Sequence, residues 1–596
     1  MPTHVLDDGQ RAAVEVAPGH RQLVIAPPGS GKTEVVSHLV AHLLESGADP
    51  YNGVLVLSFS NAAVHAADAR LRERGAGPVT VQTMDSLAGE VLRDLSDADE
   101  FPSSFDERIR QAARLLADAD WDRLGHLEHL VVDEIQDVVG VRADFLLAIL
   151  RTLPHECGLS LLGDPAQGIY DWQLRAASRP TSRTTSMELL ALVQRMERVQ
   201  VRELSGRYRA VSRDARKVVE LRDDALRGDP DGRLEQFLAD VVPVGRIADA
   251  VAHAVRWQGT TVFLTVNNGQ ALLTAGAIAA TGQPVELRRS AHQRVLAGWI
   301  ARLLADHPTS GITRDEFDAR AAHRLPGTDP AILWRALRSV TGGRGREVDL
   351  ARLAQGLRRP RPLVPDLIEP VHAAIVVSTV HRAKGLEFDN VVRLDFPDKP
   401  WHDEVDRDED EERRLLFVAL SRARHVIARA DGPDDRRLRS LQWDGNRRWY
   451  LTGPKAWMTF GFELRIDDLD RDDPPGRDPV LAQEHIRRNV RAGDPLTLEL
   501  DLTRSTLELP VWEVLHDGVV VGRTSTDFGR ALVLGRRLGA RTGRTSSWPV
   551  LRGARVEGVA TTAGDPSSGP VGQHGLWSSV VCPAMLQVDW SGERDA

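Results

Sequence analysis

A stretch with the residue types and order of a phosphate-binding loop lies near the start of the chain. Residues 23–33 read Leu-Val-Ile-Ala-Pro-Pro-Gly-Ser-Gly-Lys-Thr, so an apolar segment runs into a glycine-rich turn that ends in Lys32 and Thr33. Glycines let backbone N–H groups converge on phosphate oxygens, the lysine reaches the β and γ phosphates, and the threonine hydroxyl coordinates Mg²⁺. The sequence therefore predicts a nucleoside triphosphate site formed by Ala26, Pro27, Pro28, Gly29, Ser30, Gly31, Lys32 and Thr33.

One position of the loop departs from the usual G-x-x-x-x-G-K-[ST] order, because Ala26 replaces the first glycine. A Gly-Ser-Gly turn before a helix is also common without any ligand. The residues that follow favour the phosphate site, since they have the apolar spacing of a helix over residues 34–45, whose N-terminus would point at the phosphates.

A pair of carboxylates after a second apolar stretch supplies the other half of such a site. Residues 129–137 read His-Leu-Val-Val-Asp-Glu-Ile-Gln-Asp, so a buried strand is expected to end at Asp133 and Glu134. Asp133 can bind the metal, together with Thr33, and Glu134 can polarise the attacking water. An acidic cluster after a strand is often only a turn or a helix cap, but it follows a phosphate loop at compatible spacing here.

The composition predicts a large protein with several hydrophobic cores. The chain has 596 residues, of which 42% are hydrophobic, and a net charge of −9. We find no run of 18 apolar residues and no signal peptide, which favours the cytoplasm and no membrane contact. The two cysteines are too few for a disulfide framework or a cysteine zinc site.

Net charge does not describe the local field, because the acidity is concentrated. Eight carboxylates fall within residues 403–412, most of them expected in a solvated loop. The basic residues are almost all arginine, and yet one of the few lysines stands at the phosphate-loop position.

Short apolar stretches alternate with helix-like segments and predict two parallel α/β sheets. The expected strands of the first sheet are residues 22–26, 54–59, 79–82, 130–133 and 159–162, and those of the second are 261–266, 374–380, 390–394 and 425–428. Beyond about residue 445 the sequence becomes β-rich, with an Asp517-Gly518 turn typical of a hairpin.

An ordered series of motifs resembles the UvrD-like DNA helicases of superfamily 1. Leu6 to Gln10 resembles the adenine-reading motif of that family, with Gln10 at the adenine. Residues 57–61 and 83–87 resemble its first DNA-contacting motifs, which implies DNA contacts by Phe59, Asn61 and Thr83, although Met84 and Asp85 replace the usual aromatic and histidine.

Residues 162–172 resemble the segment that couples hydrolysis to DNA in the family. This resemblance implies that Gln167 senses the γ-phosphate and that Tyr170 and Trp172 contact bases. Taken alone, a Phe, Tyr or Trp in an α/β domain is more often part of the core.

The later motifs follow in the same order. Arg207-Tyr208-Arg209 resembles the Asn-Tyr-Arg element, with Arg207 in place of the asparagine, which implies that Tyr208 stacks near the adenine and Arg209 acts on the γ-phosphate. Residues 379–388 imply a DNA contact by His381 and a ribose contact by Glu387, and residues 412–424 imply a second γ-phosphate arginine, Arg422.

The resemblance implies two RecA-like P-loop NTPase domains with parallel sheets, reduced helical insertions and a β-rich C-terminal accessory domain. The expected boundaries are 1–198, with an insertion at about 87–128; 199–444, with an insertion at about 287–372; and 445–596. Residues 445–596 do not show the separated acidic residues expected of the nuclease domains that are fused to some relatives.

The resemblance also implies an ATP-dependent single-stranded DNA translocase and 3′ to 5′ DNA helicase that uses ATP and Mg²⁺ in repair, recombination or replication restart. Its partner would be single-stranded DNA or DNA with a 3′ single-stranded tail. The alternative is a nucleotide-gated regulatory or anti-phage defence subunit, with DNA-stimulated ATPase, little unwinding, and a protein partner held through residues 445–596. RNA in place of DNA stays open, because backbone gripping and stacking work on either strand type.

Overall fold

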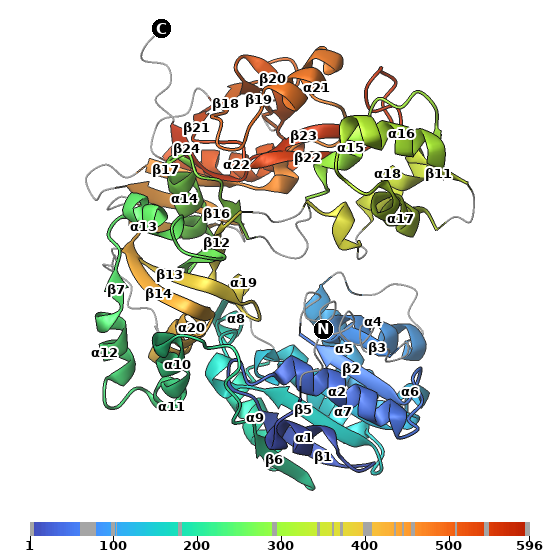
Figure 1. The fold of residues 1–596 in the computed structure, drawn as a ribbon, viewed down its shortest axis with the longest axis vertical. Coiled ribbons are helices and arrows are strands. Elements are labelled where there is room, and N and C mark those ends of the chain that lie inside the picture. The colour runs from blue at the N-terminus through green and yellow to red at the C-terminus, as the bar shows by residue number, and fades with distance from the viewer. Residues whose placement is uncertain are drawn as a thin grey trace. The chain divides into compact units, whose positions relative to one another are not determined.

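The structure is a computed structural model of the whole chain. It describes residues 5–59, 79–96, 102, 104–176, 182–288, 295–342, 346–359, 363–369, 373–396, 408–433, 437–443, 446–453, 459–506, 509–541 and 548–589. Contacts divide the chain into two units, and Figure 1 labels their helices and strands. The first unit holds residues 1–242, 383–391 and 402–427, and the second holds residues 243–382, 392–401 and 428–596.

The first unit is built on a parallel sheet with the strand order β3-β2-β4-β5-β1-β6. Its strands are β1 (Arg21–Ile25), β2 (Val54–Ser58), β3 (Thr80–Thr83), β4 (His129–Asp133), β5 (Gly158–Gly163) and β6 (Val199–Glu203). In register, Asp133 at the end of β4 lies opposite Ser58 of β2 and Leu162 of β5. The carboxyl ends of these strands therefore meet at one edge, where the phosphate loop also begins.

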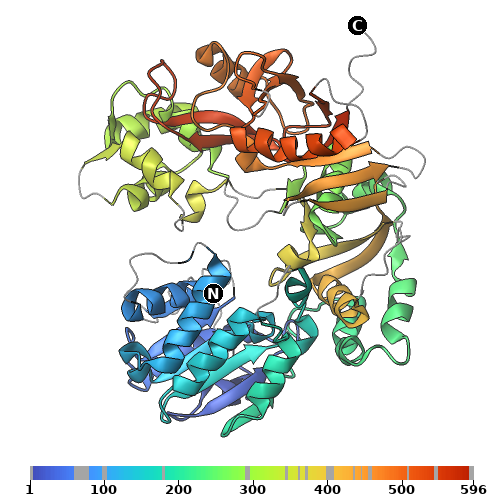
Figure 2. The same cartoon turned by 180° about the vertical axis from the view of Figure 1, so that it is seen from behind.

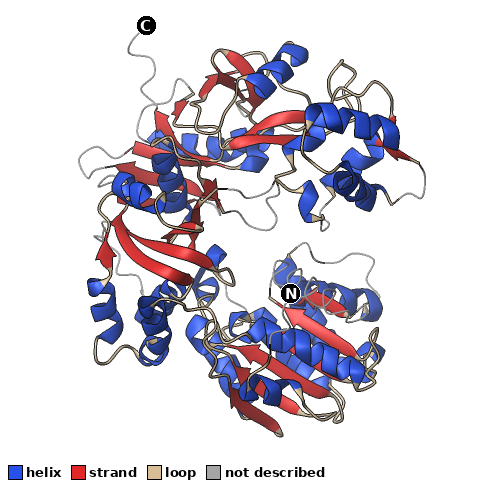
Figure 3. Cartoon of the chain, viewed as in Figure 1, coloured by secondary structure: helices blue, strands red, loops and turns tan. Residues whose placement is uncertain are grey.

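Helices cover both faces of this sheet, as Figure 3 shows for the described residues. The helices of the first unit are α1 (Asp8–Val14), α2 (Lys32–Glu45), α4 (Met84–Leu95), α5 (Phe105–Asp118), α6 (Asp122–Gly125), α7 (Val141–Thr152), α8 (Trp172–Ala176), α9 (Ser186–Gln194), α10 (Arg213–Glu220), α11 (Arg222–Arg227), α12 (Arg233–Asp240) and α20 (Glu409–Leu420), with 3₁₀ turns η1 (Ile135–Asp137) and η2 (Pro165–Gln167). Of these, α10, α11, α12 and α20 pack mainly against one another and η2.

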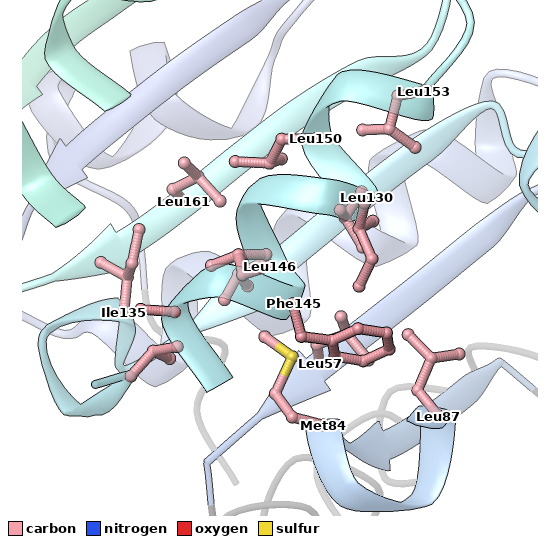
Figure 4. Close-up of a cluster of buried hydrophobic side chains, with 14 of the residues drawn as sticks. Leu57, Met84, Leu87, Leu130, Ile135, Phe145, Leu146, Leu150, Leu153 and Leu161 are labelled. Atoms are coloured by element: carbon pink, nitrogen blue, oxygen red, sulfur yellow. The ribbon is translucent and has the colours of Figure 1, made fainter. Parts of the chain in front are cut away.

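Successive residues of these strands pack into two separate hydrophobic cores, one on each face of the sheet. Leu57, Leu130 and Leu161 point to one face, where they pack with Phe145 of α7 and Met84 of α4 (Figure 4). Their neighbours Val56, Val131 and Leu162 point to the other face and pack with α1 and α2. This alternation follows from the two-residue period of a strand, and it explains why the strands read as continuous apolar runs.

The second sheet has the strand order β7-β14-β13-β8-β12-β9. Its strands are β7 (Val242–Pro243), β8 (Thr261–Thr265), β9 (Glu286–Leu287), β12 (Ile375–Thr379), β13 (Phe388–Asp395) and β14 (Ala423–Asp431), with helices α13 (Ile247–Ala254), α14 (Asn268–Ala279) and α19 (Val380–Ala383) nearby in sequence. β12 pairs in parallel with both β8 and β9. The first parts of β13 and β14 are counted with the first unit.

A helical subdomain interrupts the second sheet in sequence. It contains α15 (Gly298–Leu304), β10 (Gly311–Thr313), α16 (Arg314–Arg324), α17 (Pro330–Thr341), β11 (Glu347–Asp349), α18 (Leu350–Arg358) and η3 (Pro365–Leu367). Its core gathers around Phe317 and Leu337, and it also includes Ala563 and Leu576 from the C-terminal region.

The C-terminal region is rich in antiparallel strands. These are β15 (Arg437–Trp443), β16 (Asn446–Gly453), β17 (Thr459–Leu464), β18 (Thr497–Leu500), β19 (Trp512–His516), β20 (Val519–Arg523), β21 (Val550–Arg552), β22 (Gly558–Ala563), β23 (Leu576–Val581) and β24 (Ala584–Asp589), with η4 (Ile466–Asp468), α21 (Pro479–Arg488) and α22 (Thr526–Arg541). Trp449, Phe462, Trp512 and Phe528 form the centre of its core. β22 and β23 contact α15, and β24 contacts α14 (Figure 2 gives the back view).

The predicted fold class is confirmed, with two parallel α/β sheets and an antiparallel C-terminal region. The Asp517-Gly518 hairpin is present, with positive φ angles of 49° and 76° at the two turn residues. The domain boundaries stay a prediction, and β6, which begins just after the expected boundary at 198, pairs with β1 of the first sheet.

The prediction that most of the acidic run is a loop was wrong. Asp408 caps α20, and four further carboxylates of the run, at 409–412, occupy its first turn. Negative side chains are favourable there because the helix N-terminus carries a partial positive charge. Residues 401–407 lie outside the described part of the chain. Among the helices that the structure describes, none has the length and apolarity needed to cross a membrane.

Candidate functional site

The phosphate loop joins β1 to α2 within the first unit. Gly29 and Gly31 have φ angles of +77° and +82°, which side chains rarely adopt, and Gly31 is the N-cap of α2. A Cβ atom at Gly29 would lie 2.5 Å from Cβ of Arg209, and one at Gly31 would overlap Nε2 of Gln10. The loop therefore needs glycine at both positions, and its backbone leads into the N-terminus of a 14-residue helix.

Lys32 is held between the two carboxylates at the end of β4. Its Nζ atom contacts Oδ1 of Asp133 and lies 2.7 Å from Oε1 of Glu134. Burial alone would lower the pKa of Lys32, but the two negative charges raise it, so the ammonium stays charged. The lysine and both carboxylates predicted for phosphate, metal and water are thus brought together.

The pKa values of Asp133 and Glu134 are shifted in opposite directions. Burial raises the pKa of Asp133, against the opposing effect of Lys32. Burial also disfavours ionisation of Glu134, but the charges of Lys32 and Lys384 outweigh it and lower the pKa of Glu134 to about 2. An ionised Glu134 is the form that can orient and polarise water.

The backbone and the neighbours of Glu134 fix its position. Its φ angle is 58°, in the left-handed region, which non-glycine residues adopt mostly where the surroundings require it. Nε2 of Gln136 donates to Oε2 of Glu134 at 2.5 Å, and Oε1 of Gln136 accepts from the backbone N–H of Asp164 at 3.1 Å. Gln136 therefore ties the carboxylate to the end of β5.

The donors in this region fit Mg²⁺ bound with a nucleotide. In the described residues there is no group of three or more His, Cys, Asp or Glu side chains that could hold a metal alone. Thr33, just after the phosphate loop, and Asp133, at the end of β4, each offer an oxygen. Mg²⁺ is typically bound by one or two protein oxygens together with substrate phosphates and water. These two residues are the ones that would hold the ion.

The γ-phosphate residues predicted from the motifs form one hydrogen-bonded group. Nη2 of Arg422 donates to Oε1 of Gln167 at 3.0 Å, and Nε2 of Gln167 donates to Asp164 at 3.0 Å. Nη1 of Arg209 lies 3.4 Å from the carbonyl oxygen of Ser421, and its Nε lies 2.9 Å from Glu387.

Arg422 is almost completely buried, with 1% of its surface exposed. This burial, reinforced by the positive charge of Arg209, lowers the pKa of Arg422 to about 9. Two guanidinium groups held close together in this way suit an anion with several negative charges, such as the terminal phosphate of a nucleotide.

Gln10 and Tyr208 lie at the other end of the loop. Nε2 of Gln10 donates to the carbonyl oxygen of Ser30 at 2.8 Å, and its Oε1 accepts from the N–H of Asp7 at 3.1 Å. The N–H of Tyr208 donates to the carbonyl oxygen of Gly29 at 2.8 Å, and its hydroxyl donates to Asp7. That hydrogen bond raises the pKa of Tyr208 to about 12.

The predicted DNA-contacting residues are only partly gathered. The ring centres of Phe59 and Tyr170 lie 5.0 Å apart, and the ring planes form an angle of 38°. Trp172 begins α8, and its backbone N–H donates to Oε1 of Glu411 at 3.1 Å. The hydroxyl of Thr83 caps α4 by accepting from Ser86 at 3.2 Å. Of the other two predicted residues, Asn61 lies outside the described residues, and His381 belongs to α19, which is counted with the second unit.

Sequence reasoning assigned no role to a second buried lysine in the first unit. Nζ of Lys384 contacts Asp137, lies 2.5 Å from the carbonyl oxygen of Gln167, and lies 5.3 Å from the ring centre of Tyr170. Two features of the sequence could have pointed to Lys384: it lies in the same motif as Glu387, and the chain has few lysines. Sequence reasoning also missed Arg222, whose Nε lies 2.8 Å from Asp164.

Comparison with known proteins finds family models that match two segments of the chain. A family model described as the UvrD/REP helicase N-terminal domain matches residues 6–126, and one described as the UvrD-like helicase C-terminal domain matches residues 365–428. The chain is also similar to the crystal structure of a Pif1 helicase from Bacteroides in complex with ADP-AlF3 and ssDNA. That match has 15% sequence identity, covers 72% of this chain and 92% of that one, and has a TM-score of 0.33.

No curated protein matches the chain. The two family matches contain the adenine, phosphate-loop and first DNA motifs at one end, and Lys384, Glu387 and Arg422 at the other. Residues 6–126 and 365–428 are therefore similar to the N-terminal and C-terminal domains of UvrD-like helicases.

Proposed function

We propose that the protein is an ATP-dependent single-stranded DNA translocase that unwinds duplex DNA in the 3′ to 5′ direction during repair, recombination or replication restart. The observation that carries the proposal is a continuous series of buried and partly buried contacts in the first unit. These contacts run from Lys32 through Glu134, Gln136 and Asp164 to Gln167 and Arg422.

Each residue of this series has a chemical role in the proposal. The backbone of the loop and Lys32 bind the phosphates, while Thr33 and Asp133 hold Mg²⁺. Bound Mg²⁺ neutralises charge on the phosphates during transfer. Glu134 orients the attacking water, and Arg209 and Arg422 stabilise the negative charge of the transferred group, an effect worth about 10³ to 10⁵ in rate for arginine fingers.

The base side of the nucleotide site is defined by Gln10, Tyr208 and Glu387. Tyr208 is 43% exposed, so part of its side chain is accessible from solvent. Gln10 is completely buried and braces the loop at Ser30, while Glu387 pairs with Arg209. We assign adenine stacking to Tyr208 and a ribose contact to Glu387.

The DNA side is carried by aromatic side chains close to the same motif as the γ-phosphate sensor. Tyr170 and Trp172 follow Gln167 by only a few residues, and Phe59 contacts Tyr170. Stacking of a base on an aromatic ring is worth on the order of 1 to 3 kcal/mol. Movement of Gln167 during hydrolysis is therefore transmitted to Tyr170 and Trp172, the residues proposed to stack on bases, through only a few intervening residues.

Strand displacement on tailed duplexes tests this function. The protein with ATP and Mg²⁺ should release the short strand from a duplex with a 3′ single-stranded tail, and release at least tenfold less from a matched duplex with a 5′ tail. Glu134→Gln should release neither strand. Equal release from both duplexes would contradict the direction, and no release despite DNA-stimulated hydrolysis would favour the partner-gated alternative.

A further inference from the structure

A cavity of about 390 Å³ lies in the second unit, outside both segments that match the family models. Three parts of this unit form its walls: residues 295–296 and 357–359 of the helical subdomain, the turn at 466–471, and the β22–β23 hairpin. Ligand sites in proteins typically have volumes of about 300 to 1,000 Å³ and combine apolar side chains with a few polar groups that orient the ligand. The cavity has the size and the mixed lining of such a site.

One face of the β22–β23 hairpin gives the cavity a floor of small side chains. Ala560 lies opposite Ser579 in the strand register, and Thr562 is two residues further along β22, so all three point to the same face. The hydroxyls of Thr562 and Ser579 bond each other at 2.6 Å, which uses one of their two hydrogens and leaves the other hydrogen and several lone pairs. The floor therefore offers both a donor and acceptors.

Apolar side chains from all three walls surround this floor. Leu296, Leu469 and Val580 are 9%, 9% and 2% exposed, and each belongs to a different wall. The carbonyl oxygen of Leu296 accepts from the N–H of Thr561 at 3.1 Å, which fixes the first wall against the hairpin. A ligand body that fills the cavity would remove the remaining apolar surface from water, and this removal favours binding.

The charged residues that line the cavity are paired, with one exception. Arg471 lies 2.5 Å from Asp467, and Asp470 and Arg358 pair with residues outside the cavity. Within the described part of the chain, the side chain of Arg359 makes no ion pair or hydrogen bond, and it is exposed directly after α18. The uncompensated charge of the cavity lining is therefore positive.

We propose that this cavity binds a small organic anion, a compact apolar body that carries one phosphate or carboxylate. The anionic group pairs with Arg359, because a guanidinium presents its N–H donors in a planar fork that fits the oxygens of either group. The apolar body contacts Leu296, Leu469 and Val580, and its polar edge meets the hydroxyl pair of the floor. The inference goes beyond the proposed function and does not depend on ATP hydrolysis, since the cavity lies wholly in the second unit.

Fluorine NMR of two probes, para-fluorophenyl phosphate and para-fluorobenzoate, measures this binding to the purified protein. The nucleotide site is first filled with a non-hydrolysable ATP analogue and Mg²⁺, so that the phosphate loop cannot bind the probes. The parent should bind at least one probe saturably, and at least about tenfold more tightly than the uncharged para-fluorobenzyl alcohol, because hydrogen bonds to charged groups are the stronger ones. The tighter of the two probes identifies the preferred anion.

Two pairs of variants locate the site. Arg359→Gln should weaken binding of the preferred probe at least about tenfold, whereas Arg352→Gln, exposed on α18 and outside the cavity lining, should bind like the parent. Ala560→Leu fills the floor of the cavity and should abolish binding. Ala322→Leu adds the same volume at an exposed position of α16 and should leave binding unchanged.

A parent that binds neither anionic probe, or that binds the alcohol as tightly as the anions, would overturn the inference. Binding by a folded Arg359→Gln with the affinity of the parent would overturn it as well, and this variant should fold because the replaced side chain is exposed. None of these results changes the strand displacement that tests the proposed function, so the two can fail separately.

Discussion

At the residue scale, two neighbouring carboxylates of one turn have pKa values shifted in opposite directions, because lysine charges outweigh burial at Glu134 and burial outweighs them at Asp137. Glu134 has a pKa of about 2 owing to Lys32 and Lys384, despite its burial, whereas burial raises the pKa of Asp137 to about 7. Glu134, the proposed water-orienting group, is therefore ionised throughout the physiological pH range. Catalytic sites typically show such separation of pKa values between adjacent groups.

The role of Glu134 gives the first prediction. Glu134→Gln keeps the shape of the side chain but cannot polarise water, so ATP should bind within about threefold of the parent while kcat falls by about 10² to 10⁴. Binding of a fluorescent ATP analogue and steady-state phosphate release measure the two quantities. Glu45→Gln, at the exposed end of α2, is the control and should leave both unchanged. Unaltered turnover in Glu134→Gln would remove Glu134 from the mechanism.

His129 gives a prediction about pH and stability. Burial, assisted by the charge of His20, lowers the pKa of His129 to about 4, against about 6.5 in the unfolded chain. Between these values the unfolded chain binds a proton that the folded chain does not, so acidification through this range should destabilise the fold by up to about 3 kcal/mol. The apparent Tm should therefore fall less between pH 7.5 and 5.0 in His129→Gln than in the parent. An equal fall in both proteins would contradict this account.

At the scale of elements, the phosphate loop depends on two left-handed glycines in front of α2. Gly29→Ala would place a Cβ atom against Arg209 at a φ angle of +77°, and left-handed backbone costs a non-glycine residue about 1 to 2 kcal/mol. We expect nucleotide binding to weaken at least tenfold, because both the loop and Arg209 must shift.

Gly89 is the matched control for this substitution. It lies within α4, and nothing lies within 4 Å of its added Cβ atom. Gly89→Ala should keep nucleotide binding and stabilise the helix by about 0.5 to 1 kcal/mol. Isothermal titration with ATP and thermal unfolding of both variants test the pair, and unchanged ATP affinity in Gly29→Ala would show that the loop tolerates a side chain.

Much of the element pattern could be predicted because buried parallel strands read as unbroken apolar runs. β1, β2, β4 and β5 all lie where such runs predict them, and the two carboxylates at the end of β4 follow from the same pattern. β6 differs, since its residues alternate with polar side chains and only its pairing with β1 assigns it to the first sheet. Sequence could not assign Lys384, because its contacts join motifs that are 217 to 247 residues apart.

At the scale of the whole molecule, the C-terminal region is built into the second unit. Ala563 and Leu576 belong to the core of the helical subdomain, and the hydroxyl of Thr561 accepts from the N–H of Ala301 at 2.9 Å and donates to the carbonyl oxygen of Ala297 at 2.7 Å. Met585 packs against the core of the second α/β sheet. The region therefore shares its cores with earlier parts of the chain.

This arrangement predicts the effect of truncation. A chain that ends at residue 444 would lose β22 to β24 and expose the apolar residues that pack against them, so it should aggregate or bind a hydrophobic dye strongly. A chain that ends at Asp589 keeps all of these strands and is the matched control. Soluble, cooperatively unfolding protein from the shorter chain would mean that residues 445–596 are a separable appendage.

The most direct test of the account is ATP hydrolysis by the purified protein, residues 1–596, without nucleic acid and with single-stranded DNA, duplex DNA or RNA, each beside Lys32→Ala. Contacts that link Glu134 and Gln167 to the aromatic pair of Phe59 and Tyr170 predict that single-stranded DNA raises kcat at least tenfold, and that Lys32→Ala abolishes the activity. Hydrolysis at the same rate with every nucleic acid and with none would contradict a DNA-driven motor.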